Sequence, residues 1–138
     1  MSAPAVAVSS KGTKFAAAWM DKRAGEKSLK VYWSISPNPS FPNDSLLAEE
    51  ATGFQNHPTL AMEGSGTVWA VWEDNGSGQN RIWARSSEPK SRSFEVSKAS
   101  EGKAAFPVVA ANGGLVAVVY EVERDGEDKV LFRLLKSE

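Results

Sequence analysis

Short stretches of alternating polar and apolar residues run along the chain and are separated by turns. The clearest stretch is residues 81–86 (RIWARS), and its period of two is typical of a β-strand. The turn before it, residues 74–78, contains the dipeptide Asn75-Gly76, which favours a tight hairpin. The pattern therefore predicts antiparallel strands joined by hairpins.

This strand pattern occurs three times. Residues 68–74 (VWAVWED) match residues 15–21 (FAAAWMD) and 115–121 (LVAVVYE). Their aromatic anchors, Trp19, Trp72 and Tyr120, are 53 and 48 residues apart. Two more series keep the same order and nearly the same spacing: Trp33, Trp83 and Phe132, and Pro4, Pro58 and Pro107. Three anchors in one order indicate an internal repeat.

Each repeat is expected to form four short antiparallel strands. In repeat 1 (about 3–54) the expected strands are 5–8, 15–19, 29–34 and 45–48. In repeat 2 (about 55–103) they are 58–62, 67–72, 81–86 and 93–96. Repeat 3 (about 104–138) offers 108–111, 115–120 and 129–135, and its fourth strand is missing. Units of this kind are the blades of a β-propeller. The sequence therefore predicts an all-β fold in which residues 1–138 form one half of a propeller.

The large aromatic residues of the repeats are expected to pack between neighbouring blades. Buried aromatic side chains supply much of the apolar area of a core. This prediction covers all six aromatic anchors of the first and second series. Trp69, on the same strand as Trp72, is expected to face the other side and to be the more exposed of the two.

Residues 57–61, 68–74 and 81–86 together resemble the sialidase-type β-propeller repeat, also called the BNR or Asp-box repeat. The resemblance extends over nearly the whole chain. The family's box, Ser-x-Asp-x-Gly-x-x-aromatic, is degenerate here, because Glu88 replaces the Asp and no Gly precedes Phe94. Since the box is a structural turn, the resemblance still implies the propeller fold.

The resemblance also implies what a catalytic member would need: three arginines for a carboxylate, a Tyr–Glu nucleophile pair and an Asp acid/base. The Arg-Ile/Leu-Pro element of the first arginine is absent from the sequence, and the arginines share no repeat position. Tyr32 and Tyr120 are the two tyrosines, and both lie at predicted packing positions. The catalytic set is therefore incomplete, and the chain is predicted to be a non-catalytic member and not an enzyme.

Composition and charge narrow the partners. Sixteen Lys and Arg against seventeen Asp and Glu leave a net charge of −1, which argues against nucleic-acid binding through a basic face. With no Cys and one His, neither a thiolate site nor a multi-histidine metal site is expected, and no cofactor is predicted. No run of about 18 apolar residues indicates a membrane span. No signal peptide is evident, so the chain as written is expected to be cytoplasmic, a removed leader being the alternative.

The connections between strands 4 and 1 and between strands 2 and 3 of each blade emerge on one side of a propeller. A rigid scaffold commonly presents ligands to such loops. Their amides, carboxylates and arginines suit hydroxyl-rich ligands such as sugars, and they suit a protein surface equally well. The candidate binding residues are Asp21, Arg23, Gln55, Asn56, His57, Glu73, Asp74 and Arg124.

The leading functional hypothesis is a non-enzymatic module for a carbohydrate or protein ligand. The alternatives are a glycosidase or sialidase-like hydrolase with a site assembled between two chains, and a structural fragment of a larger propeller. Propellers close with about four to eight blades. Because three blades leave an apolar face at each end, two copies are expected to close a six-bladed ring as a homodimer.

Overall fold

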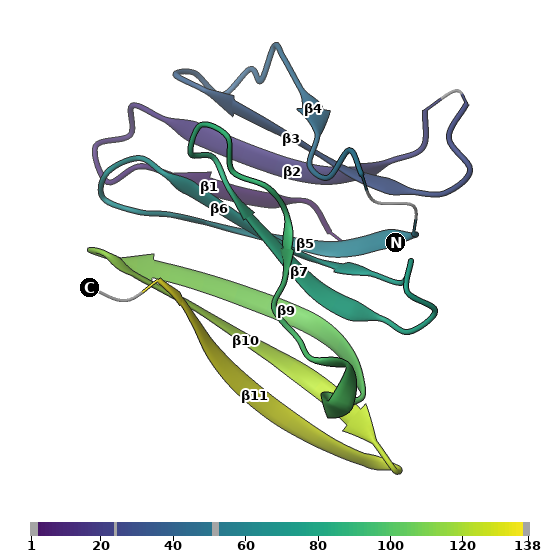
Figure 1. Cartoon of the computed structure of the whole chain (residues 1–138). Coiled ribbons are helices and arrows are strands. Elements are labelled where there is room, and N and C mark those ends of the chain that lie inside the picture. The colour runs from purple at the N-terminus through teal and green to yellow at the C-terminus, as the bar shows by residue number, and fades with distance from the viewer. Residues whose placement is uncertain (1–2, 24, 51–52, 137–138) are drawn as a thin grey trace.

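The computed structural model describes residues 3–23, 25–50 and 53–136, and it consists of three antiparallel β-sheets (Figure 1). Sheet 1 contains β1 (Ala5–Val8), β2 (Phe15–Asp21), β3 (Lys30–Ser36) and β4 (Ser45–Leu46). Sheet 2 contains β5 (Gln55–Met62), β6 (Val68–Asp74), β7 (Arg81–Ser86) and β8 (Phe94–Glu95). Sheet 3 contains β9 (Lys103–Asn112), β10 (Leu115–Arg124) and β11 (Glu127–Lys136). A single 3-10 turn, η1 (Ala99–Glu101), precedes β9, and no helix in the described ranges is long and apolar enough to cross a membrane.

The sheets are stacked in chain order, with sheet 2 between the other two (Figure 1). One apolar cluster lies between sheets 1 and 2, where Ala18 and Trp33 meet Leu60 and Trp72. The other lies between sheets 2 and 3, where residues of β6 and β7 meet β9 and β10. The core is therefore two layers of side chains, each enclosed between a pair of consecutive sheets.

The all-β prediction is confirmed, and every strand expected from the sequence overlaps an observed strand. The strands of sheet 3 are longer than expected, at ten residues each. Sheet 3 has no fourth strand among the described residues, as the sequence predicts.

The strand register tests the aromatic series. Trp19 pairs with Tyr32, Trp72 with Trp83, and Tyr120 with Leu131 across the corresponding strands. The first series is therefore structurally equivalent. The prediction for the second series is wrong by one residue at Trp83. Its structural equivalents are Tyr32 and Leu131, and not Trp33 and Phe132. A shift of one residue in a strand places the side chain on the opposite face of the sheet.

The proline series agrees with the register. Ala5 pairs with Ala18, Thr59 with Val71, and Val108 with Val119. The first residue of each pair directly follows one of the three prolines of the series. The first and second strands of the three repeats therefore pair in the same register at these positions.

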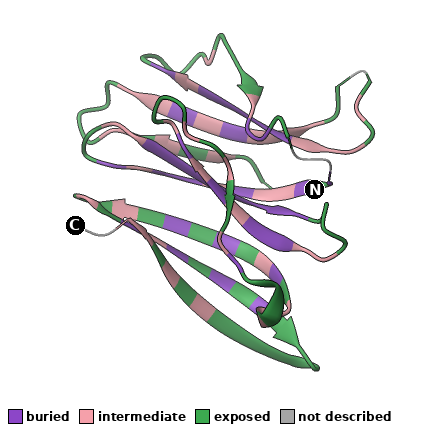
Figure 2. Ribbon diagram, in the orientation of Figure 1, coloured by how far each residue is buried: buried purple, intermediate pink, exposed green. Residues whose placement is uncertain are grey.

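Burial of the aromatic residues follows their place in the stack. Trp72, Tyr120 and Trp33 are buried as predicted. Trp83 is partly buried and packs against the cluster between sheets 1 and 2. The prediction for Trp19 is wrong, because this residue is partly exposed on the outer face of sheet 1. The prediction for Phe132 is wrong: it is 57% exposed, because it lies on the outer face of sheet 3, which no other sheet covers (Figure 2). The prediction for Trp69 is also wrong. Sheet 2 is covered on both faces, so Trp69 is buried, and its Nε1–H donates to Glu63 Oε2 at 2.9 Å.

We predict that Trp72→Ala lowers the free energy of unfolding by about 3–5 kcal/mol, because it removes a fully buried aromatic side chain. Urea unfolding measures this change through the transition midpoint. Phe54→Ala is the control, since Phe54 is partly exposed, and it should cost less than about 1 kcal/mol. A loss below about 1 kcal/mol for Trp72→Ala would contradict the assignment of this indole to the core.

Candidate functional site

The predicted residues Asn56, His57 and Glu73 lie at the junction of sheets 2 and 3. Glu73 Oε1 accepts a hydrogen bond from Asn80 Nδ2 at 2.6 Å, and Oε2 accepts one from the backbone N–H of Phe106 at 2.9 Å. His57 Nδ1 lies 2.5 Å from Glu73 Oε2, and the His57 and Phe106 rings are in edge contact at 4.9 Å. The Glu73 carboxylate therefore joins β6 to β9.

Gln55 and Asp74 are buried inside the stack. Gln55 Oε1 accepts the backbone N–H of Val31 at 2.7 Å, and Gln55 Nε2 donates to Asp74 Oδ2 at 3.3 Å. Asp74 Oδ1 in turn accepts the backbone N–H of Gly76 at 2.7 Å. Gln55 therefore ties sheet 2 to sheet 1, and its amide groups are already bonded within the protein.

Asp21 is the last residue of β2, and Arg23 follows it in the exposed β2–β3 connection of sheet 1. The Arg23 guanidinium forms a two-pronged pair with Asp44 at 3.0 and 2.7 Å, and its Nε donates to Asp21 at 3.1 Å. It also lies 3.6 Å above the centre of the Tyr32 ring. The hydrogen bond from Arg23 lowers the pKa of Asp44 below its ordinary value.

Arg124 lies apart from the other candidates, on sheet 3. Its side chain is two-thirds exposed, and its Nη1 donates to the backbone oxygen of Ser100 at 2.9 Å. The eight candidates therefore occupy several separate places and do not form one surface.

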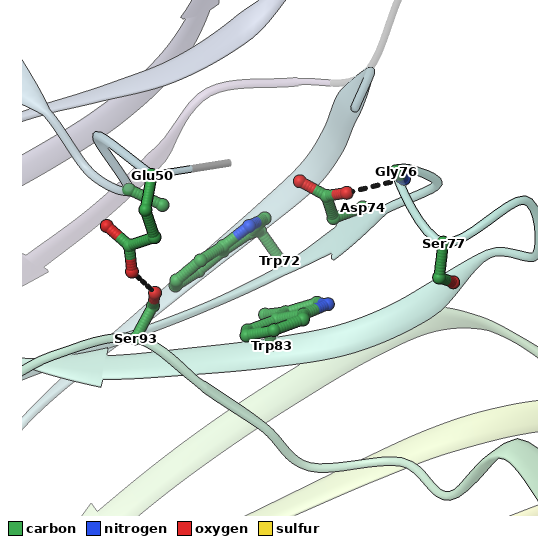
Figure 3. Close-up of a pocket in the computed structure, with 8 residues that line it drawn as sticks. Glu50, Trp72, Asp74, Gly76, Ser77, Trp83 and Ser93 are labelled. Atoms are coloured by element: carbon green, nitrogen blue, oxygen red, sulfur yellow. Dashed lines mark hydrogen bonds between the residues drawn. The ribbon is translucent and has the colours of Figure 1, made fainter. Parts of the chain in front are cut away.

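A groove between sheets 1 and 2 is a better-formed site than any of these, and its cavity volume is about 170 Å³. We call it the Trp83 groove. In Figure 3 the indoles of Trp72 and Trp83 lie in its middle, with Glu50 and Ser93 at one end. Asp74, Gly76 and Ser77 are at the other end, and Ala48 completes the lining. Of the predicted residues, only Asp74 lines it.

Electrostatics keep the Glu50 end of the groove anionic. The Ser93 hydroxyl donates a hydrogen bond to Glu50 Oε1, and this bond lowers the pKa of the Glu50 carboxyl. Arg85 and Arg92 act in the same direction. Arg85 is itself held in place, because its Nη1 donates to the backbone oxygen of Leu47 at 2.6 Å. The groove thus combines a partly exposed indole with an ionised acceptor.

The strand register identifies the positions on the other two sheets that correspond to the Trp83 groove. On the outer face of sheet 1, Arg23 corresponds to Gly76, and its guanidinium covers Tyr32, the equivalent of Trp83. At the corresponding place on sheet 3, a hollow is lined by residues of η1, β10, β11 and the turn between β10 and β11, with no aromatic side chain among them: Ser100, Glu101, Val122, Arg124, Asp125, Glu127 and Lys129. Gly76 has no side chain, and the partly exposed Trp83 ring lines the groove together with it.

Sequence reasoning missed this groove because it assigned Trp83 to the core. The contrast between Gly76 and Arg23 two residues beyond equivalent strand ends was the available signal. This contrast becomes visible only when the β2–β3 and β6–β7 hairpins are correctly aligned.

No family model matches the sequence, and no curated protein matches it. Among solved structures, the chain is similar to a fucose lectin from Kordia zhangzhouensis, solved in complex with methyl-fucoside. The TM-score is 0.58, the match covers 98% of this chain and 97% of that chain, and the sequences are 9% identical. The similarity establishes a common all-β fold.

We expect Gln55→Met to destabilise the protein by about 1–3 kcal/mol, because the buried N–H of Val31 would lose its acceptor. The matched control is Gln79→Met in the β6–β7 connection, which should change stability by about 0.5 kcal/mol or less. Thermal and urea unfolding of both variants measure the difference. Equal stability of the two variants would show that Gln55 does not tie the sheets together.

Proposed function

We propose that this protein is a non-enzymatic carbohydrate-binding module and that the Trp83 groove holds a single sugar ring. The observation that carries the proposal is the partly exposed Trp83 indole beside the ionised Glu50 carboxylate. A sugar ring has an apolar C–H face and a rim of hydroxyl groups. The indole offers a flat apolar surface to the face, and Glu50, Ser77 and Ser93 offer hydrogen-bonding oxygens to the rim.

The size of the groove favours a small ligand. Its volume of about 170 Å³ is below the range of about 300–1,000 Å³ typical of pockets for drug-sized molecules. A hollow lined by Glu49, Arg85, Ser91 and Arg92 adjoins it and shares Glu50, Trp83 and Ser93. A longer glycan could therefore extend from the groove into this hollow. The lectin of similar fold was solved with a methyl-fucoside, which supports a carbohydrate as the ligand class.

The chemistry of the groove favours binding over hydrolysis. A glycosidase needs one carboxyl that is protonated and acts as a general acid. Glu50 is kept ionised by Ser93, and Asp74 is buried and bonded to Gln55 and Gly76. This pair supplies hydrogen-bond acceptors and no evident proton donor. The proposal therefore places the protein among lectins and not among hydrolases.

We also infer that the three sheets are consecutive blades of a sialidase-type propeller, half of a six-bladed ring that two copies complete as a homodimer. Consecutive antiparallel sheets stacked face to face, with equivalent residues in equivalent registers, support this inference.

Trp83→Ala is expected to weaken sugar binding at least tenfold, about 1.4 kcal/mol, because the sugar loses its apolar platform. Isothermal titration calorimetry against methyl-fucoside, galactose, glucose and mannose measures the affinity. Trp83→Phe should retain part of it. Arg124→Ala, in the corresponding hollow of η1 and sheet 3, should leave the affinity unchanged. An unchanged affinity in Trp83→Ala would remove this groove from consideration.

The affinity is also expected to depend on pH in a specific way. Because Ser93 lowers the pKa of Glu50, the carboxylate stays ionised below the ordinary glutamate value of 4.5. Binding should therefore stay constant from pH 7 to about that value and weaken only below it. Glu50→Gln should bind more weakly at pH 7 and lose the acid dependence. A decline beginning near pH 6 in the wild-type protein would assign the dependence to another group.

A further inference from the structure

The outer face of sheet 3 is apolar and uncovered. Val108, Val119 and Phe132 lie side by side across its three strands, and each is exposed. Figure 2 shows exposed positions interspersed with buried ones along β9 and β10. Soluble monomers rarely present a continuous apolar patch of this kind, and such patches mark interaction surfaces.

The outer face of sheet 1, at the other end of the stack, is apolar as well. Val6 and Val8 of β1 are exposed, and Phe15, Ala17 and Trp19 of β2 are partly exposed. Their neighbours Ala16 and Ala18, on the opposite face of the same strand, are completely buried against sheet 2.

The register shows what each outer face would fit. Phe132 corresponds to Trp33 of sheet 1 and Ala84 of sheet 2, and both are buried against the sheet that follows. Val6 corresponds to Leu60 of sheet 2 and Val109 of sheet 3, which lie in the two inter-sheet clusters. The outer face of sheet 3 therefore corresponds to the faces of sheets 1 and 2 that the next sheet covers. The outer face of sheet 1 corresponds to the faces of sheets 2 and 3 that pack on the preceding sheet.

The two outer faces also carry the equivalents of a donor and an acceptor that form a hydrogen bond between sheets 2 and 3. Between sheets 2 and 3, Glu73 accepts the backbone N–H of Phe106, the residue before Pro107. Glu121 is the equivalent of Glu73 in sheet 3, and it is exposed. Ala3, the residue before Pro4, is the equivalent of Phe106. A second copy whose sheet 1 covered sheet 3 would bring the Ala3 N–H to Glu121.

We infer that the outer face of sheet 3 docks on the outer face of sheet 1 of a second copy, and that two identical head-to-tail contacts close the pair. Head-to-tail contacts form a closed assembly when the rotation between copies returns to the start. The inference rests on the proposed half-propeller. It is independent of sugar binding, because the Trp83 groove lies between two sheets of one chain.

Two single variants test this contact. Phe132→Asp places a charge on the face of sheet 3, and Val6→Asp places one on the face of sheet 1, where the valine is 70% exposed. Both positions are exposed within the chain, so both variants should fold, which circular dichroism checks. Phe54→Asp is the control, because Phe54 is partly exposed and lies on neither face.

Light scattering coupled to size exclusion should give twice the 14.9 kDa chain mass for the wild type and for Phe54→Asp. Each of the other variants should be a folded monomer. An equimolar mixture of Phe132→Asp and Val6→Asp should form a dimer again, since the intact sheet 3 of one can dock on the intact sheet 1 of the other.

A wild-type monomer would overturn the inference. A dimer of Val6→Asp alone would also overturn it, since it would mean that two sheet 3 faces pair with each other. An equimolar mixture of the two variants that stays monomeric at millimolar concentration would overturn it as well. Sugar titration of the monomeric variants separates the two proposals, because the Trp83 groove should remain intact in them.

Discussion

Each sheet of this protein has two apolar faces, and the need to cover both of them governs the rest of the structure. Successive side chains of a strand point to opposite faces. In β6, between two neighbouring sheets, every residue from Val68 to Asp74 is buried. In β10, at the end of the stack, buried residues alternate with exposed or half-buried ones from Leu115 to Tyr120. The two strands have similar sequences and equivalent registers, so the difference arises from their neighbours.

Polar groups at the junctions determine how one sheet is placed on the next. Gln55 accepts the backbone N–H of Val31, Glu73 accepts that of Phe106, and Arg85 donates to the backbone oxygen of Leu47. Each bond links two neighbouring sheets. An apolar interface tolerates sliding, whereas a buried polar group that loses its partner costs about 1–3 kcal/mol. These bonds therefore select one placement, and they account for several polar residues that resemble ligand-binding groups in the sequence.

The strands, the three-sheet order and the absence of a fourth strand of sheet 3 from the described residues could be predicted from the sequence, because alternation and turn residues act locally. The face of each aromatic could not. The connection between Asp21 and Lys30 is longer than the one between Asp74 and Arg81, so nearly equal spacings along the chain concealed a shift of one residue. The groove was missed for the same reason, since Trp83 aligns with Tyr32 only through the strand register.

A stack of repeated sheets presents similar grooves at equivalent places, and the side chain at one position decides which of them stays open. On sheet 1 that position is Arg23, which covers Tyr32. At the Trp83 groove it is Gly76, where a Cβ atom would lie 3.0 Å from the backbone nitrogen of Gly53 and 2.9 Å from Asp74 Oδ1. A larger residue there would press on the junction between the sheets. The close packing that requires glycine at position 76 therefore also leaves the partly exposed Trp83 ring without a covering side chain from this position, in contrast to Tyr32 beneath Arg23.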